Sequence, residues 1–110
     1  VNKNCVPCEG NIAPFNVDEI HKYLKKVDGW EVSEDKIDGF HLLKNFKFDN
    51  FLQSQAFVNK VGEIAESEGH HPDLWFGWGY ARIKIYTHAI KGLAESDFIL
   101  AAKIDQISNA

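Results

Sequence analysis

The sequence predicts an α+β protein, a two-layer sandwich in which a four-stranded antiparallel sheet carries helices on one face. Stretches with helical periodicity alternate with pairs of stretches that have strand periodicity, in the order α-β-β-α-β-β-α. The two strands of each pair are close in sequence and are joined by turn residues, so they form antiparallel hairpins. Helices that separate hairpins collect on one side of the sheet. A length of 110 residues allows one domain.

The domain is expected over residues 16–110, after an N-terminal arm over residues 1–15. The arm carries Cys5 and Cys8, and their C-V-P-C spacing is found in zinc and redox sites. A zinc site needs four ligands, and the chain has no second pair of this kind. A thioredoxin-type pair would lie between a strand and a helix, which the short segment before Cys5 does not allow. We therefore predict a solvated arm.

The first helix is predicted over residues 17–27. Asn16 can cap its N-terminus, and Glu19 three residues later completes a capping box. The apolar residues with the spacing of one buried helix face are Ile20, Tyr23, Leu24 and Val27. Asp28-Gly29 is a turn signal that ends the helix.

Two strands are predicted next. Trp30 and Val32 alternate with polar neighbours, as in a short strand, and residues 34–39 have the composition of a turn. The large apolar residues of the second strand that share one parity are Phe40, Leu42, Phe46 and Phe48. Lys44 interrupts this parity, which predicts a bulge or a sheet edge.

The second helix is predicted from a cap at Asp49 to about Glu68, and Gly69 ends it. The residues of its apolar stripe are Phe51, Val58, Val61, Ile64 and Ala65, with Phe57 beside them. The link that follows is predicted to be extended, because Pro72 disfavours helical geometry in His71.

A hairpin and a third helix complete the chain. Residues 74–78 form the first predicted strand of the hairpin, its tip lies at Gly79-Tyr80, and residues 81–88 alternate regularly between the two faces of the second strand. The last helix is predicted over residues 95–107. One face of the sheet then lacks a helical cover and the sheet has open edges, which favours self-association.

The composition excludes several classes of function. Hydrophobic residues make up 45% of the chain and charged residues 25%, as in ordinary globular proteins. The formal net charge is −4 with mixed signs, so direct binding to nucleic acid, which needs a basic face, is not expected. No apolar run is long enough to span a membrane. No signal peptide is visible, which predicts a cytoplasmic protein, although a chain that begins at Val1 without methionine leaves an upstream targeting segment open.

Three histidines are expected to meet at one end of the sheet. His70 and His71 follow the second helix, and His88 lies at the end of the last predicted strand. A hairpin with its tip near residue 79 places residues 70–72 opposite residues 86–88. The cluster therefore combines side chains from two segments that are separated in sequence.

This cluster has the chemistry of an acid–base site. Imidazoles exchange protons near neutral pH, so one histidine can donate a proton while another accepts one. Glu66, one helical turn before the pair, can favour one protonated member. A zinc site is the rival interpretation, because three histidines and a carboxylate could bind the metal. Adjacent side chains of an extended segment point in opposite directions, so we expect no metal. His21 and His41 are expected to be exposed or structural.

The residues around the cluster are arranged as in one known family. The family pattern has an acid, His-His-Pro, an aromatic, a later His and a final Asp, which here are Glu66, His70-His71-Pro72, Trp75, His88 and Asp97. Further matches upstream are Gly29-Trp30, Phe46-Lys47-Phe48 and Phe51. Over residues 16–107 the sequence resembles the pterin-4a-carbinolamine dehydratase family.

The resemblance implies a two-layer α+β fold and a homodimer or homotetramer. It also implies a lyase of the hydro-lyase class, which converts 4a-hydroxytetrahydrobiopterin into quinonoid dihydropterin and water in tetrahydrobiopterin recycling. Hydroxide is a poor leaving group, so a general acid must protonate it while a base removes the proton on N5. This chemistry calls for no redox cofactor and no metal.

The resemblance implies a catalytic set of His70, His71 and His88. We assign His71 and His88 as the proton-transfer pair, whereas His70 holds the pterin or shares the role of base. The residues implied to contact the pterin or to orient a histidine are Glu66, Pro72, Trp75, Tyr86, Thr87 and Ala89. Asp97 is expected to act mainly through the dipole of the last helix.

The alternative function is a protein-binding module. Some members of the family also act as a dimerisation cofactor for a homeodomain transcription factor, that is, as a transcriptional coactivator. Nothing in the sequence identifies such a partner. Substitutions at the histidines distinguish the two functions, because they abolish dehydration and leave protein binding intact.

Overall fold

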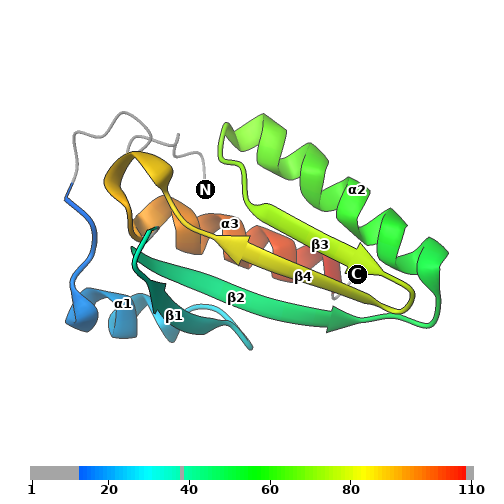
Figure 1. Cartoon of the computed structure of the whole chain (residues 1–110), viewed down its shortest axis with the longest axis horizontal. Helices are drawn as coiled ribbons and strands as arrows, with labels where there is room; N and C mark the ends of the chain where they lie inside the picture. The colour runs from blue at the N-terminus through cyan, green and yellow to red at the C-terminus, as the bar shows by residue number, and fades with distance from the viewer. Residues whose placement is uncertain (1–12, 38, 109–110) are drawn as a thin grey trace.

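The computed structural model describes residues 13–37 and 39–108 of the chain. In chain order, the elements are α1 (Val17–Leu24), β1 (Glu31–Asp35), β2 (Gly39–Lys47), α2 (Phe51–Glu68), β3 (Asp73–Gly77), β4 (Tyr80–Ile85), the short 3-10 helix η2 (His88–Ile90) and α3 (Glu95–Ser108). The four strands form one antiparallel sheet in the order β1-β2-β4-β3, so β1 and β3 are its edges. Figure 1 shows α3 behind the sheet and α2 running alongside β3. The predicted α+β class and the order of the elements are confirmed.

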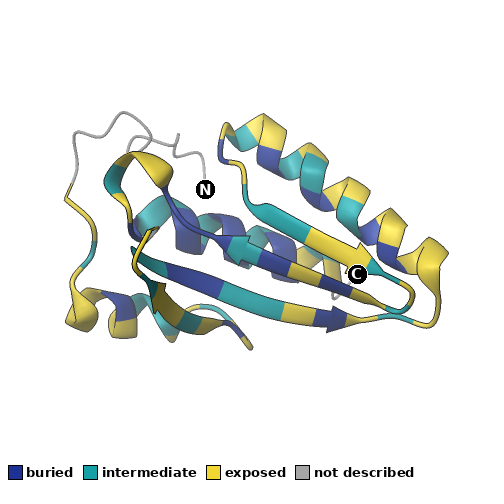
Figure 2. Ribbon diagram, in the orientation of Figure 1, coloured by how far each residue is buried: buried dark blue, intermediate teal, exposed yellow. Residues whose placement is uncertain are grey.

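The helices cover one face of the sheet, and the pattern of burial along β4 identifies the side chains on that face. Ala81, Ile83 and Ile85 are fully buried, whereas Tyr80 and Arg82, which alternate with them, are exposed. Figure 2 shows this alternation of buried and exposed residues along the strands. The buried side chains from sheet and helices that form one core cluster include Leu42, Phe46, Phe57, Val61, Phe98, Leu100 and Ile104. Burial of each large side chain of this kind contributes about 1.5–3 kcal/mol. The core therefore holds the helices to the sheet.

The start of α1 follows the prediction and its end does not. Asn16 Oδ1 accepts the Glu19 N–H at 2.9 Å, and Glu19 Oε1 accepts the Asn16 N–H at 3.0 Å, which completes the capping box. The helix ends at Leu24 instead of residue 27. A tighter turn follows, in which the Lys26 N–H donates to the Tyr23 carbonyl at 2.9 Å.

The cap of α2 is Asn50, so the prediction of Asp49 is wrong by one residue. Asn50 Oδ1 accepts the Gln53 N–H at 2.9 Å, whereas the Asp49 backbone N–H donates to Gln53 Oε1 at 2.8 Å. A capping side chain reaches the N–H three residues on, and only Asn50 stands directly before the first helical residue. The C-terminal end at Gly69 is as predicted.

The predicted bulge or edge at Lys44 is also wrong. β2 is a central strand, and its register against β4 is unbroken from residue 42 to residue 47. Lys44 Nζ lies 2.8 Å from Asp105 Oδ1 of α3, and Trp30 Nε1 donates to the same carboxylate at 3.0 Å. A charge inside a protein is tolerated when it is paired and hydrogen-bonded. The break in the apolar pattern therefore marks an ion pair that joins the sheet to α3.

The last hairpin is shifted slightly from its prediction. β3 begins at Asp73 and ends at Gly77, and β4 begins at Tyr80, so the tip lies at residues 78–79. β4 ends at Ile85 because the chain then turns into η2. This early end places the last residues of the predicted strand in a loop beside the sheet.

The arm is only partly described. Cys5 and Cys8 lie outside the described residues, and so does the prediction made for them. Phe15, the last residue of the predicted arm, packs against Tyr23 and Phe98, with ring centroids 4.8 and 6.2 Å apart. Among the described helices, none combines the length and the apolar character needed to cross a lipid bilayer.

We expect Gly39→Ala to lower the free energy of unfolding by about 2 kcal/mol or more. Gly39 has a φ of 72°, and an added Cβ would overlap the backbone carbonyl oxygen of Lys91. The matched control is Gly62→Ala in α2, where a Cβ meets nothing within 4 Å. That change should stabilise the helix by about 0.5–1 kcal/mol. Urea unfolding of both variants measures the difference, and equal effects would contradict the packing of Gly39 against Lys91.

Candidate active site

The end of α2 directs two histidines toward the end of the sheet. Gly69 adopts a left-handed conformation with a φ of 66°, and its N–H donates to the carbonyl of Glu66 at 3.2 Å. The His70 N–H donates to the Ala65 carbonyl at 3.1 Å, which completes the helix end. Pro72 then prevents further helix, and β3 begins with the next residue.

A loop after β4 brings the third histidine to the same place. In the β3–β4 ladder, Asp73 lies opposite Lys84, so the segments before Asp73 and after Lys84 run side by side. Thr87 pairs with Gly92 across the loop, and its N–H donates to the Gly92 carbonyl at 2.9 Å. His88 begins η2 between these two residues.

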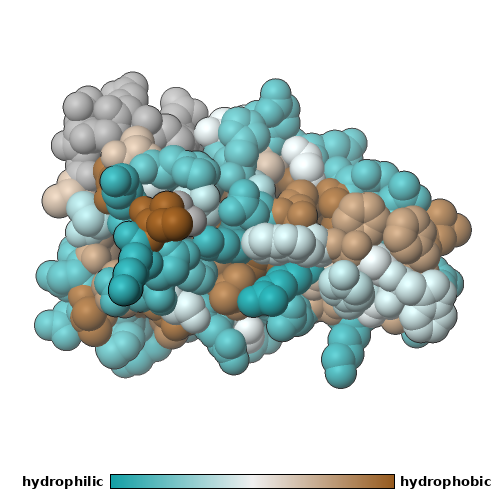
Figure 3. Space-filling view, in the orientation of Figure 1, coloured by the Kyte–Doolittle hydropathy of each residue, from teal (hydrophilic) through white to brown (hydrophobic). Residues whose placement is uncertain are grey.

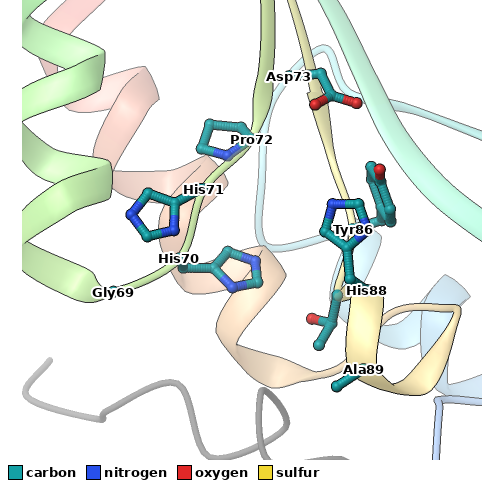
Figure 4. Close-up of a pocket in the computed structure, with 9 residues that line it drawn as sticks. Gly69, His70, His71, Pro72, Asp73, Tyr86, His88 and Ala89 are labelled. Carbon is teal, nitrogen blue, oxygen red and sulfur yellow. The ribbon is translucent and has the colours of Figure 1, made fainter.

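A pocket of about 530 Å³ lies between the two segments (Figure 4). The residues that line it are Gly69, His70, His71, Pro72, Asp73, Tyr86, Thr87, His88 and Ala89. A volume of this size suits a small-molecule ligand. All three histidines of the cluster therefore face one cavity that can hold such a ligand.

His70 is held by a buried carboxylate. Its Nε2 lies 2.6 Å from Asp97 Oδ1, and the two side chains are 4% and 0% exposed. Asp97 Oδ2 also accepts the Thr87 hydroxyl at 2.9 Å and the Ala94 N–H at 2.8 Å. A carboxylate that accepts an imidazole N–H fixes the orientation and the tautomer of the ring. Asp97 thus joins the start of α3 to both segments of the pocket.

His71 and His88 stand in more open surroundings. His71 Nε2 lies 2.7 Å from Glu66 Oε1, and these side chains are 65% and 81% exposed. His88 is exposed and packs against the ring of Tyr86, with centroids 4.3 Å apart. The Tyr86 ring in turn lies 4.9 Å from Lys84 Nζ. The three imidazoles therefore have three different partners and different access to water.

The structure brings most of the predicted site residues together. Pro72, Tyr86, Thr87 and Ala89 line the pocket with the histidines, and Glu66 lies behind His71. Trp75 is not among the lining residues. It lies within β3, 48% exposed, with its ring 5.9 Å from the guanidinium carbon of Arg82.

Two features of the pocket were not predicted as parts of the site. Asp73 lines the pocket although the prediction passed over it, and its place directly after His-His-Pro is the signal that could have found it. Asp97 was assigned to the helix dipole, and its contact with His70 joins residues 27 positions apart. Local sequence patterns do not reveal a contact of that separation.

The remaining histidines lie elsewhere. His21 is exposed on α1, and His41 is buried in β2, where Nδ1 lies 3.6 Å from Asp35 Oδ2. Within residues 13–37 and 39–108, no group of three His, Cys, Asp or Glu side chains is arranged to hold a metal ion.

A family model described as Pterin 4 alpha carbinolamine dehydratase matches residues 13–107. The chain belongs to this family. Pterin-4a-carbinolamine dehydratase activity is thereby supported at the level of the family. The match begins before α1 and ends one residue before the end of α3, so it covers nearly all of the described fold.

Relatives within the family are similar over nearly the whole chain. A protein of Rubrobacter xylanophilus, provisionally named a pterin-4-alpha-carbinolamine dehydratase, is 48% identical over 105 residues, which are 96% of this chain and 94% of the relative. A protein of Methylococcus capsulatus with the same provisional name is 45% identical over 106 residues, covering 96% of this chain and 90% of the relative.

Solved structures of dehydratase-like proteins share the fold. A transcriptional coactivator/pterin dehydratase from Brucella melitensis is 25% identical, with a TM-score of 0.78 over 86% of this chain and 98% of that chain. A pterin dehydratase-like protein described as a RuBisCO assembly factor in the alpha-carboxysome is 24% identical, with a TM-score of 0.62 over 74% of this chain and 92% of that chain. The second likeness concerns the fold alone.

Proposed function

We propose that this protein dehydrates 4a-hydroxytetrahydrobiopterin by general acid–base catalysis with histidines, as a step in the recycling of tetrahydrobiopterin. The observation that carries the proposal is the convergence of His70, His71 and His88 on one pocket, each with a different partner. Imidazoles exchange protons near neutral pH, so several of them around one ligand can supply both an acid and a base.

The reaction removes water from two neighbouring atoms of the pterin. The C4a–O bond breaks as the oxygen receives a proton from the acid, and the lone pair of N5 forms the new C4a=N5 bond. The proton on N5 passes to the base, so the products are quinonoid dihydropterin and one water. No electron leaves the substrate, and the net proton balance is zero.

The surroundings of each histidine favour particular roles. His71 and His88 are exposed, so they can exchange protons with water and return to their starting states after each turnover. We assign these two as the acid–base pair without distinguishing which is which. His70 is buried against Asp97, which suits a group that holds the pterin or shares the role of base.

The test is stopped-flow absorbance of the decay of synthetic 4a-hydroxytetrahydropterin, with and without the protein and with EDTA. We expect acceleration that survives EDTA, because the proposed proton transfers need no metal. Acceleration that EDTA abolishes would replace the acid–base proposal with a metal-dependent one. No acceleration by well-folded protein would reject the dehydratase proposal.

We also propose that the protein forms a homodimer or homotetramer. Large apolar side chains are exposed where the β3–β4 hairpin meets the start of α2 (Figure 3), namely Phe51, Leu52, Phe76, Trp78 and Tyr80. β3 is also an open edge of the sheet. Exposed apolar groups beside an open strand favour association with another chain.

We expect sedimentation velocity to give the mass of a dimer or tetramer, and Trp78→Ser to shift the protein toward the monomer. Trp78 is 72% exposed within the apolar region. The control is Ile37→Ser, because Ile37 is 78% exposed but lies in the β1–β2 turn. If the wild-type protein is a monomer, or if the two changes have equal effects, the apolar region is not the interface between copies of the chain.

A second candidate function is binding to a protein partner as a coactivator. The observation that favours it is the likeness to the Brucella melitensis protein, whose description includes transcriptional coactivator. The apolar region defined above is a surface on which such a partner could bind. Variants at His71 and His88 would leave this function intact and abolish dehydration.

A further inference from the structure

We propose that Asp73 determines ligand specificity by binding the 2-amino-4-oxo edge of the pterin ring. The assignment rests on the proposed function, because it places a pterin in the pocket. It adds a residue that selects the substrate class and has no part in the proton transfers.

The position of Asp73 is fixed by the sheet. It is the first residue of β3, and its register partner on β4 is Lys84. Its side chain is half-buried and lines the pocket. Figure 4 shows it at the opposite end of the pocket from Ala89, with His88 between them. A ligand that fills the pocket therefore lies against Asp73 at one end and near His88 at its middle.

Asp73 is the carboxylate of the pocket that remains available to a ligand. Among the nine lining residues it is the only Asp or Glu. The two neighbouring carboxylates are engaged, since Glu66 binds His71 and Asp97 binds His70. Within residues 13–37 and 39–108, the Asp73 carboxylate has no hydrogen bond or ion pair.

The pterin ring has one edge that matches a carboxylate. N3–H and the 2-amino group are adjacent donors that point the same way, as two N–H groups of a guanidinium do. A carboxylate accepts such a pair through both oxygens, and the geometry makes the contact specific. The other polar side chains of the pocket do not offer two acceptors side by side, because they are imidazoles and hydroxyls.

The 2-oxo analogue, lumazine, tests this recognition. Its carbonyl at position 2 replaces the amino group and would place an acceptor against the carboxylate. A site built to bind a donor rejects a ligand that lacks it, because the buried polar group stays unpaired. Asn in place of Asp73 offers one acceptor and one donor, so it suits lumazine as well as pterin.

The experiment is calorimetric titration of the full chain with 7,8-dihydropterin and with 7,8-dihydrolumazine. We expect the wild-type protein to prefer the pterin by at least about tenfold in Kd, and Asp73→Asn to remove most of that preference. Asp73→Glu keeps the carboxylate and should keep the preference even where the affinity falls. Glu63→Gln changes the same charge on the exposed face of α2 and should leave both Kd values unchanged.

The outcomes separate this assignment from the proposed function. If the wild-type protein prefers the pterin and the Asp73→Asn variant keeps the full preference, the role of Asp73 is wrong. The dehydratase proposal would then still stand. A wild-type protein that binds neither ligand and does not accelerate dehydration would overturn both. The control is thermal unfolding of each variant, which tests whether the fold is retained.

Discussion

Replacing His71 or His88 with alanine should lower the kcat of dehydration by about 100- to 10,000-fold, the usual contribution of a general acid or base. Both residues line the pocket, and both are exposed enough to exchange protons with water. Since neither side chain is part of the core, the variants should keep the wild-type melting temperature. Stopped-flow decay of 4a-hydroxytetrahydropterin measures the rate, and thermal unfolding by circular dichroism measures the stability.

The control is His21→Ala, which removes an exposed histidine on α1, away from the pocket. It should leave kcat unchanged. The double variant at positions 71 and 88 tests whether the two residues act together. When two groups act in the same step, the double variant loses less activity than the two single variants predict by addition of their free energies. If both single variants dehydrate at the wild-type rate, the assignment of the proton-transfer pair is wrong.

Replacing Asp97 with asparagine should lower both stability and activity. Asp97 is fully buried and accepts bonds from His70, Thr87 and the Ala94 N–H. Asn leaves at least one of these donors without its acceptor, which should cost about 2–4 kcal/mol in the free energy of unfolding. Asp97 also orients His70, so its loss should lower kcat by about 10- to 100-fold, as is typical for such supporting residues.

The pH dependence of kcat separates these two effects. A contribution to stability alone would lower the melting temperature and leave the pH profile of the folded enzyme unchanged. A role in orienting His70 should change the shape of the profile, because the ring is no longer held in one tautomer. Thr87→Val is the matched control, since it removes one bond to Asp97 and keeps the contact with His70. An Asp97→Asn enzyme with wild-type kcat and an unchanged profile would contradict the orienting role.

The parts of the fold set by local patterns could be predicted from the sequence. Asn16 and Glu19 form the expected capping box because both partners lie within one helical turn. The alternation in β4 follows from burial on one face, and Gly69 ends α2 because the chain must adopt a positive φ there. Counting residues back from the hairpin tip also placed the histidines at one end of the sheet, because the register of a hairpin follows from its turn.

Other placements could not be predicted from local patterns. Lys44 in β2 pairs with Asp105, 61 residues later, and without that partner its charge looks like a break in the strand. Asp97 binds His70 across 27 residues, so its helix position alone pointed only to the dipole. Trp75 matches the family pattern in sequence, and in the structure it lies exposed beside Arg82. The placement of such side chains follows from packing, which spacing along the chain does not record.

The β3–β4 ladder has one further consequence. The Asp73–Lys84 pair stands at the end that holds the pocket, and the Gly77–Tyr80 pair stands at the end that carries the exposed aromatic residues. Four residue steps at about 3.4 Å each separate these ends by roughly 14 Å. The surface that we propose for self-association and the pocket that we propose for dehydration therefore lie at opposite ends of a single hairpin. We expect a substitution or a designed inhibitor at one end to leave the proposed role of the other end unchanged.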